Sequence, residues 1–114
     1  MISMRCVIVF ADVHDFSKAA VALGDRLPAF VQEYYETVGE RIVRAHGSIV
    51  KYMGDAVLAV FADKTESTAV QCALAMRADF GELARRWELG RATELEVGVT
   101  AGRVTRGKIG RAHV

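Results

Sequence analysis

Hydrophobic residues form two kinds of strand pattern near the two ends of this chain. Residues 5–11 are almost continuously apolar and β-branched, which predicts a strand buried on both faces that ends at Asp12. Residues 95–102 instead alternate between apolar and polar or glycine positions, which predicts a strand with one buried face. The two patterns indicate a sheet that contains both ends of the chain.

Two longer segments carry apolar residues at helical spacing. The first spans residues 27–46, with Pro28 in its first turn and Gly47 as its stop. Its apolar stripe is Leu27, Phe30, Val31, Tyr34, Tyr35, Val38 and Ile42. The second spans residues 65–88 and ends at Gly90, and Asp63 with Glu66 has the spacing of a capping box. Its expected buried stripe is Val70, Ala73, Leu74, Phe80, Leu83, Ala84 and Trp87.

A hairpin is predicted between the two helices. Residues 48–53 and 56–61 are rich in strand-forming side chains, and Gly54-Asp55 between them favours a tight reversal. Lys51 precedes the turn in an otherwise apolar strand. A cation and an anion on one stiff element, beside a glycine that permits close approach, suit a polyphosphate or a metal ion. The alternative is structural: Asp55 forms the turn and Lys51 is an edge-strand charge.

The order strand, helix, strand, strand, helix, strand is the ferredoxin-like βαββαβ pattern of an α+β domain. Helices then cover one face of an antiparallel sheet, and the first strand lies in its middle. The hairpin turn comes beside the end of that strand, so Asp12 and Asp55 are expected to be neighbours.

A polar turn follows the first strand at residues 13–17. Ser17 is expected to cap a short helix that runs through Leu23 and ends at Gly24. Backbone N–H groups from His14 to Ser17 would then be placed to receive a triphosphate at the start of this helix.

Composition narrows the class of protein. The chain has 114 residues, enough for one domain, and 52% of them are hydrophobic. A net charge of +1 gives no reason to expect a nucleic-acid partner. Two cysteines in apolar surroundings make neither a disulfide framework nor a zinc site, so a reduced, cytoplasmic setting is expected. No apolar run approaches the length of a membrane span.

Two neighbouring carboxylates without a counter-charge repel each other, and a divalent cation relieves this repulsion. Mg²⁺ commonly takes one or two protein carboxylates and completes its shell with water and phosphates. The carbonyl of Val13 is placed to contribute as a further ligand. The alternative is two turn aspartates with no shared role.

Three segments resemble the catalytic domain of the class III nucleotidyl cyclases, the family of adenylate and guanylate cyclases. Residues 9–17 (VFADVHDFS) are similar to its first metal motif and residues 46–61 (HGSIVKYMGDAVLAVF) to its second. Residues 98–110 (GVTAGRVTRGKIG) resemble the glycine-rich strand pair that follows. The resemblance covers essentially the whole chain in register. A diguanylate cyclase is disfavoured, because Met53-Gly54-Asp55 lacks the double glycine of its acidic hairpin.

The resemblance implies a reaction and a set of site residues. Asp12 and Asp55, with Val13, would bind two Mg²⁺ or Mn²⁺ ions, and ATP would be converted to cyclic AMP and pyrophosphate. Lys51 matches the purine-reading lysine of adenylate cyclases, whereas guanylate cyclases carry a glutamate there and bind GTP. In the family the site lies between two catalytic domains, which implies a homodimer. The resemblance also implies a regulatory domain upstream in a longer protein. Substrate contacts are then expected from His14, Asp15, Phe16, Ser17 and Gly54.

The chain also departs from the family pattern. Asp15 stands where a glycine is common, and His14 occupies a variable position. Family domains continue past Gly110 to residues that orient the ribose and stabilise the transition state. We therefore expect residues 1–114 to be one partial catalytic domain, nearly inactive alone. The alternative functions are a catalytically silent nucleotide-binding or dimerising module, or a guanylate cyclase.

The last residues of the chain, 109–114 (IGRAHV), match one reading frame of a widely used sequencing adapter. The hypothesis is that they are a non-native end, although Ile109-Gly110 also fits the family. A genuine genomic stop after Val114 would exclude it.

Overall fold

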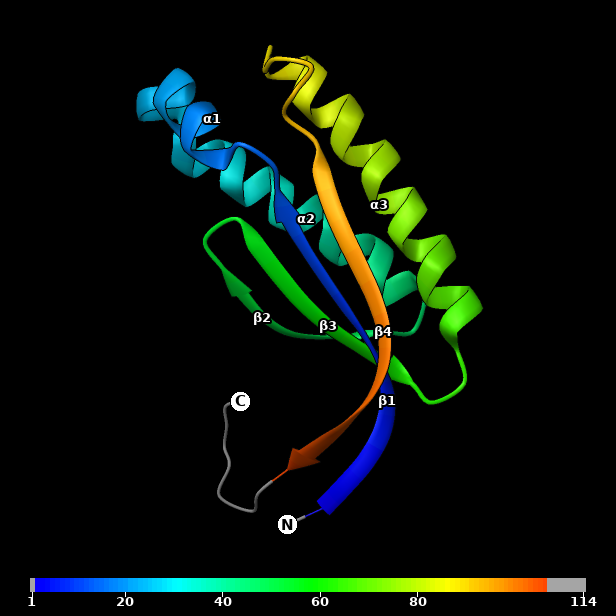
Figure 1. The fold of residues 1–114 in the computed structure, drawn as a ribbon. Coiled ribbons are helices and arrows are strands. Elements are labelled where there is room, and N and C mark those ends of the chain that lie inside the picture. The colour runs from blue at the N-terminus through cyan, green and yellow to red at the C-terminus, as the bar shows by residue number, and fades with distance from the viewer. Residues whose placement is uncertain (1, 107–114) are drawn as a thin grey trace.

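The computed structural model describes residues 2–106, in an order of elements that matches the predicted βαββαβ pattern together with the predicted short helix after the first strand (Figure 1). The proposed non-native end at residues 109–114 lies outside the described residues. The elements are β1 (Ile2–Val13), α1 (Phe16–Leu23), a 3₁₀ turn η1 (Gly24–Arg26), α2 (Leu27–Arg44), β2 (Ser48–Met53), β3 (Ala56–Ala62), α3 (Glu66–Arg86) and β4 (Leu95–Arg106).

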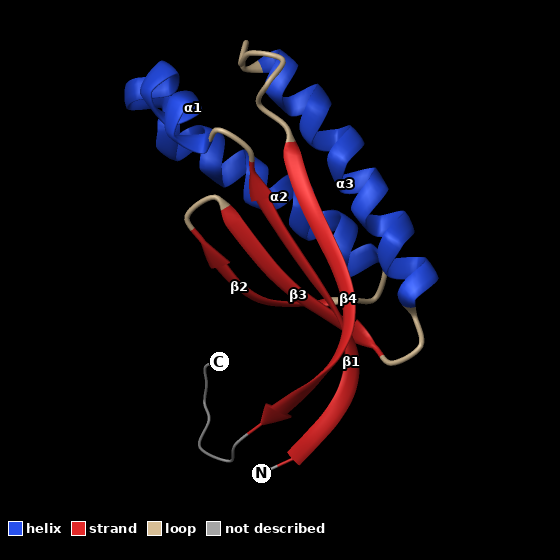
Figure 2. Cartoon of the chain, viewed as in Figure 1, coloured by secondary structure: helices blue, strands red, loops and turns tan. Residues whose placement is uncertain are grey.

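The described strands form one antiparallel sheet in the order β2-β3-β1-β4, which confirms the α+β class and the central place of the first strand. Helices α2 and α3 lie together on one face of this sheet (Figure 2). Strand β1 turns alternate side chains toward them: Val7, Val9, Ala11 and Val13 are buried, whereas Phe10 is 41% exposed. The opposite sheet face, called the open face below, carries Phe10 and Asp12.

Aromatic side chains fill the core between the sheet and the helices. The Phe30 ring lies 6.5 Å from that of Tyr34, 6.2 Å from Phe80 and 5.6 Å from Trp87, measured between centroids. Phe80 and Trp87 meet the Phe30 ring edge-to-face, and the Tyr34 ring is nearly parallel to it. Aromatic contacts of both kinds add to the gain from apolar burial. The cluster joins α2 to α3 and fixes α2 against the sheet.

Strand β1 is longer than its apolar run predicted. The prediction ended the strand at Asp12, but pairing with β4 continues from Ile2↔Arg106 to Val13↔Leu95. Asp12 faces Glu96 in this register. A strand needs apolar residues only on the face that it buries, so polar residues on the open face do not stop the pairing.

Helix α3 differs from the prediction in its buried face and its cap. Val70 and Leu74, predicted to be buried, are 44% and 58% exposed. Ala73, Phe80, Leu83 and Ala84 are buried as predicted, and Ala69, Cys72 and Met76 complete the buried face in place of Val70 and Leu74. The predicted capping box is absent from this helix start: Thr65 is the N-cap residue, and no side chain bonds to the cap. Asp63 instead lies 3.9 Å from Arg5.

The C-terminal end of α2 is near its predicted place, but for a different reason. The left-handed residue after the helix is His46, with φ of 66°, and not Gly47. A Cβ on Gly47 would lie 2.7 Å from the Phe61 ring. The glycine therefore permits close packing of the chain on β3.

Polar contacts connect α2 to α3 at the edge of the core. Arg41 donates to both carboxylate oxygens of Asp79, at 2.6 and 3.1 Å. Glu33 accepts hydrogen bonds from Arg86 at 2.6 Å and from the Trp87 indole at 3.0 Å. The bond from Arg86, followed by that from Trp87, lowers the pKa of Glu33.

Replacing Glu33 by Gln is expected to lower the free energy of unfolding at neutral pH by less than about 1 kcal/mol. Because the folded-state pKa of Glu33 lies below its unfolded value, its contribution is present above the unfolded pKa and is lost as pH falls through the folded pKa. Urea unfolding of parent and variant at neutral pH and at a pH of about 3.5 should show the difference shrinking in acid. A difference that stays constant with pH would contradict a role for the charge.

Within residues 2–106, no helix is both long enough and apolar enough to cross a membrane.

Candidate active site

Asp12 is half-buried near the end of β1 and belongs to the open face of the sheet. Strand alternation puts it there, because Ala11 and Val13 on either side are buried toward the helices. The opposed residue on β4 is Glu96, so two carboxylate-bearing residues pair across the strands. Like charges in this arrangement repel, which favours a cation nearby.

Asp55 comes to the end of β1 from the hairpin turn. Its Oδ2 atom accepts a hydrogen bond from the backbone N–H of Val13 at 3.2 Å. The pairing of β1 with β3 stops at Ala11↔Val57, so the Asp55 carboxylate takes the place of the next strand partner. The structure therefore brings together the strand end and the turn that the topology predicted to meet.

The carboxylates of Asp55 and Asp12 both influence the pKa of one buried hydroxyl, that of Tyr34. Burial raises the pKa of Tyr34 well above its ordinary range, and the negative charges of Asp55 and Asp12 raise it further. The Tyr34 hydroxyl, which donates to the carbonyl oxygen of Asp55 at 2.8 Å, thus stays protonated at neutral pH.

The loop after β1 departs in part from the prediction. The His14 ring lies between two carboxylates: its Nε2 is 3.6 Å from Oδ2 of Asp15, and its Nδ1 is 3.4 Å from Oε2 of Glu96. Its backbone N–H donates to the carbonyl of Glu94 at 2.8 Å, so this amide is already engaged and does not point to a triphosphate, as had been expected.

The short helix α1 also begins differently from the prediction. Asp15, with a left-handed φ of 58°, is its N-cap residue, so the expected cap at Ser17 is wrong. Ser17 is exposed within the first turn, and Phe16 packs against the core and anchors the helix start. Gly24 ends α1 as predicted.

Lys51 is exposed on β2 and lies on the same open face as Asp12, but apart from it. Lys51 pairs with Leu58 of β3, and Leu58 pairs with Phe10 of β1. Two strand spacings, about 9–10 Å, therefore separate Lys51 from the strand of Asp12. Within one subunit the structure places the Asp55 carboxylate against the Val13 amide, next to Asp12 in the chain, and leaves the lysine two strands away.

The donor set suits a hard divalent cation. Two carboxylates and a backbone carbonyl supply the oxygen ligands that Mg²⁺ and Mn²⁺ prefer. Among residues 2–106, no group of three His, Cys, Asp or Glu side chains is placed to hold a metal ion by itself. The arrangement fits an ion whose remaining ligands come from water and phosphate.

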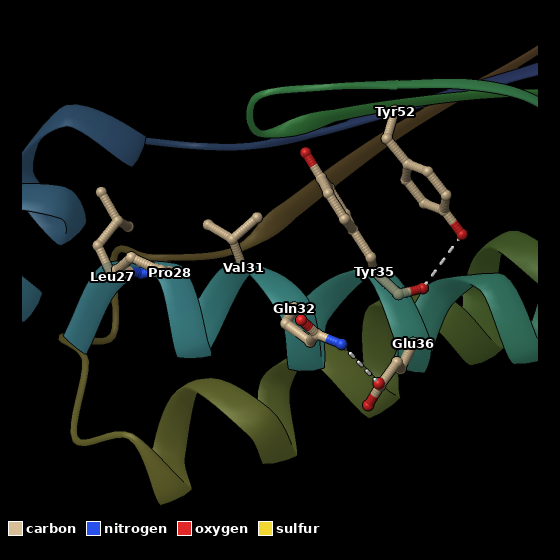
Figure 3. Close-up of a pocket in the computed structure, with 7 residues that line it drawn as sticks. All are labelled: Leu27, Pro28, Val31, Gln32, Tyr35, Glu36 and Tyr52. Atoms are coloured by element: carbon tan, nitrogen blue, oxygen red, sulfur yellow. Dashed lines mark hydrogen bonds between the residues drawn. The ribbon is translucent and has the colours of Figure 1, made fainter.

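One surface groove is lined by neither of these carboxylates. About 690 Å³ in volume, it runs along α2 and the side of β2 that faces the helices (Figure 3). Its lining residues are Leu27, Pro28, Val31, Gln32, Tyr35, Glu36 and Tyr52. A second hollow of about 380 Å³ is bordered by His14, Arg77 and Glu94–Val97, next to the loop after β1.

Sequence reasoning missed three residues near the site. The alternating pattern of its strand marks Glu96 only as a polar position. Tyr34 and Tyr35 were assigned to the apolar stripe of α2, although a buried tyrosine hydroxyl requires a hydrogen-bond partner, which was the available signal.

The chain is similar to known proteins in sequence and in structure. Residues 3–114 match the family model described as the adenylate and guanylate cyclase catalytic domain. An adenylate cyclase of Anabaena cylindrica is 26% identical over an alignment 113 residues long; the match covers 93% of this chain and 22% of that protein. The chain thus spans about a fifth of this relative's length.

Two crystal structures show the same fold. The guanylyl cyclase Cya2 is 23% identical with a TM-score of 0.82, covering 96% of this chain and 59% of that one. The adenylyl cyclase CyaB from P. aeruginosa is 22% identical with a TM-score of 0.78, covering 90% and 59%. With its sheet order, its hairpin and the match over residues 3–114, the chain belongs to the family of adenylate and guanylate cyclase catalytic domains.

Proposed function

We propose that this chain is the metal-binding part of an adenylate cyclase domain that converts ATP to cyclic AMP and pyrophosphate. The observation that carries the proposal is the hydrogen bond from the Val13 N–H to Asp55, which sets the hairpin carboxylate beside the strand end that bears Asp12. Two oxygen-rich groups at one rigid place are what a metal-dependent phosphoryl transfer needs.

Asp12, Asp55 and the carbonyl of Val13 would hold two Mg²⁺ or Mn²⁺ ions. When bound, such ions favour ionisation of the ribose 3′-hydroxyl and neutralise charge on the leaving pyrophosphate. The N–H groups at the start of α1 would bind phosphate oxygens, with the amide of His14 excluded because it is engaged. Gly54 has a φ of 60°, and no atom lies within 4 Å of the position that a Cβ would take, which leaves room for the substrate on that side of the turn.

Lys51 would read the purine, and it would do so in the site of a second copy. Its separation from the Asp12 strand supports this, because one subunit alone does not put the lysine beside the two aspartates. The open face carries Met4 and Phe10, which are 45% and 41% exposed, as the surface that the second copy would cover. A cationic donor suits the N1 acceptor of adenine, which favours ATP over GTP.

A catalytically silent nucleotide-binding or dimerising module is the alternative, and one observation favours it. Glu96 opposes Asp12 and lies near His14, so it adds negative charge where a triphosphate would approach. In a domain extended to full family length, a silent module would bind an ATP analogue without making cyclic AMP. Turnover of ATP by the same protein would exclude this alternative.

Replacing Lys51 by Glu is expected to reverse the nucleotide preference. A carboxylate pairs with the N1–H and amino donors of guanine and repels the N1 acceptor of adenine, so the ratio of ATP-analogue to GTP-analogue affinity should fall by at least about tenfold. Equilibrium dialysis with Mn²⁺ and non-cyclisable analogues measures both affinities.

Lys64→Glu is the matched control, because Lys64 is an exposed lysine in the turn after β3 and makes the same change of charge. Its ratio should stay at the parent value. An unchanged ratio in Lys51→Glu would contradict the assignment of Lys51, and absence of any Mn²⁺-dependent nucleotide binding by the parent would contradict the proposed function.

A further inference from the structure

Tyr34 is a fully buried side chain of α2 whose hydroxyl reaches the hairpin turn. Its ring packs in the core against Phe30 and Phe80, and its exposed fraction is 0%. Its hydroxyl donates to the backbone carbonyl of Asp55 at 2.8 Å. A phenylalanine would fill the same space, so the hydroxyl is used for this one contact across the fold.

Tyr35, the next residue of α2, makes the equivalent contact one residue earlier in the turn. Its hydroxyl donates to the carbonyl of Gly54 at 2.5 Å. Its ring lies on that of Tyr52 from β2, with centroids 4.2 Å apart, and the Tyr52 hydroxyl donates to the Tyr35 carbonyl at 3.4 Å (Figure 3). Consecutive tyrosines of one helix therefore hold consecutive carbonyls of the turn.

These contacts restrict the position of the Asp55 carboxylate. With both carbonyls held, the backbone from which the side chain departs is fixed, and the bond from Val13 limits rotation of the carboxylate itself. Metal ligands must be held within about 0.5 Å of their working positions, and partners beyond the ligands supply this precision.

We propose that Tyr34 and Tyr35 are positioning residues, whose hydroxyls hold the Gly54-Asp55 turn so that the Asp55 carboxylate faces Asp12 and receives a divalent cation. This inference rests on the proposed function and adds the residues that organise its metal site. Neither tyrosine is expected to touch the cation, since both approach the turn from the side of the helices.

The test uses Tyr34→Phe and Tyr35→Phe in the full chain, because each removes one hydroxyl and keeps the ring. Tyr52→Phe is the matched control: it removes a hydroxyl from the same cluster that contacts α2 and not the turn. The first measurement is amide hydrogen exchange at Val13, relative to the core amide of Val9 in the same strand. The second is Mn²⁺ affinity, from the electron paramagnetic resonance signal of free Mn²⁺.

The expected result is exchange at Val13 that is faster by about tenfold relative to Val9 in both test variants, and Mn²⁺ affinity lower by about 10–100-fold. Tyr52→Phe should match the parent in both measurements. Because a general loss of stability moves both amides, the ratio separates positioning from packing.

Val13 exchange and Mn²⁺ affinity that equal the parent values in both test variants would overturn the inference. Failure of the proposed function would look different, since the parent chain would then bind no Mn²⁺. The exchange ratio at Val13 would in that case still decide whether the two hydroxyls hold Asp55.

Discussion

The Asp55→Asn variant should bind Mn²⁺ at least about 100-fold more weakly than the parent chain. Asp55 is bonded to the Val13 amide, next to Asp12, and is one of the two carboxylates proposed as metal ligands, so its neutralisation removes a charged ligand from the cation. A metal ligand is expected to matter at least as much as the groups that orient it, whose loss typically costs about 10–100-fold. Titration of free Mn²⁺ measures the affinity directly.

The fold itself should tolerate this substitution. The side-chain oxygen of the introduced asparagine would still accept the N–H of Val13, and removing one of two neighbouring like charges relieves repulsion. Urea unfolding without metal should therefore give a free energy equal to the parent's within about 0.5 kcal/mol.

Asp25→Asn serves as the control, since Asp25 is an exposed aspartate in η1, outside the site. It should bind Mn²⁺ as the parent does. Parent-like affinity in Asp55→Asn would remove Asp55 from the metal site and, with it, the main support for the proposed reaction.

Phe30→Ala should have the largest effect on stability. Phe30 is fully buried and contacts the rings of Tyr34, Phe80 and Trp87. Truncating such a side chain costs about 3–5 kcal/mol, because apolar burial is lost and a cavity remains. The free energy of unfolding of a small domain is only about 5–15 kcal/mol in total. A loss of this size should therefore lower the thermal midpoint by about 10–20 °C.

Val43→Ala is the matched control on the same helix, because Val43 is 63% exposed. Its unfolding free energy should remain within about 0.5 kcal/mol of the parent value. Circular dichroism during heating and in urea measures both variants. A loss in Phe30→Ala as small as that in Val43→Ala would mean that the aromatic cluster does not organise the core.

The sequence allowed the sheet order to be predicted because its strand signals are strong and local. Residues 48–53 and 56–61 are separated by a glycine that adopts a φ of 60°, and the observed hairpin has nearly those bounds. Once the hairpin and the two helices were assigned, the ferredoxin-like order placed the first strand in the middle. The contact between the end of β1 at Val13 and the hairpin turn at Asp55 agrees with that topology.

The features that were missed depend on contacts between distant parts of the chain. Helix α3 buries small and sulfur-containing residues such as Ala69 and Met76, whereas its more hydrophobic Val70 and Leu74 face outward, so the apolar pattern indicated a face rotated from the real one. The hydroxyls of Tyr34 and Tyr35 find acceptors 19–21 positions further along the chain. No local pattern specifies such partners.

The central place of β1 has a consequence for how the chain is made. This strand leaves the ribosome before its neighbours β3 and β4, which are synthesised later, and Ile2 finally pairs with Arg106. Contacts between residues so far apart form slowly, and until then both edges of an apolar strand stay unpaired. We therefore expect the nascent chain to fold only after β4 has emerged. Until then, chaperones would be needed to prevent aggregation through the exposed strand edges.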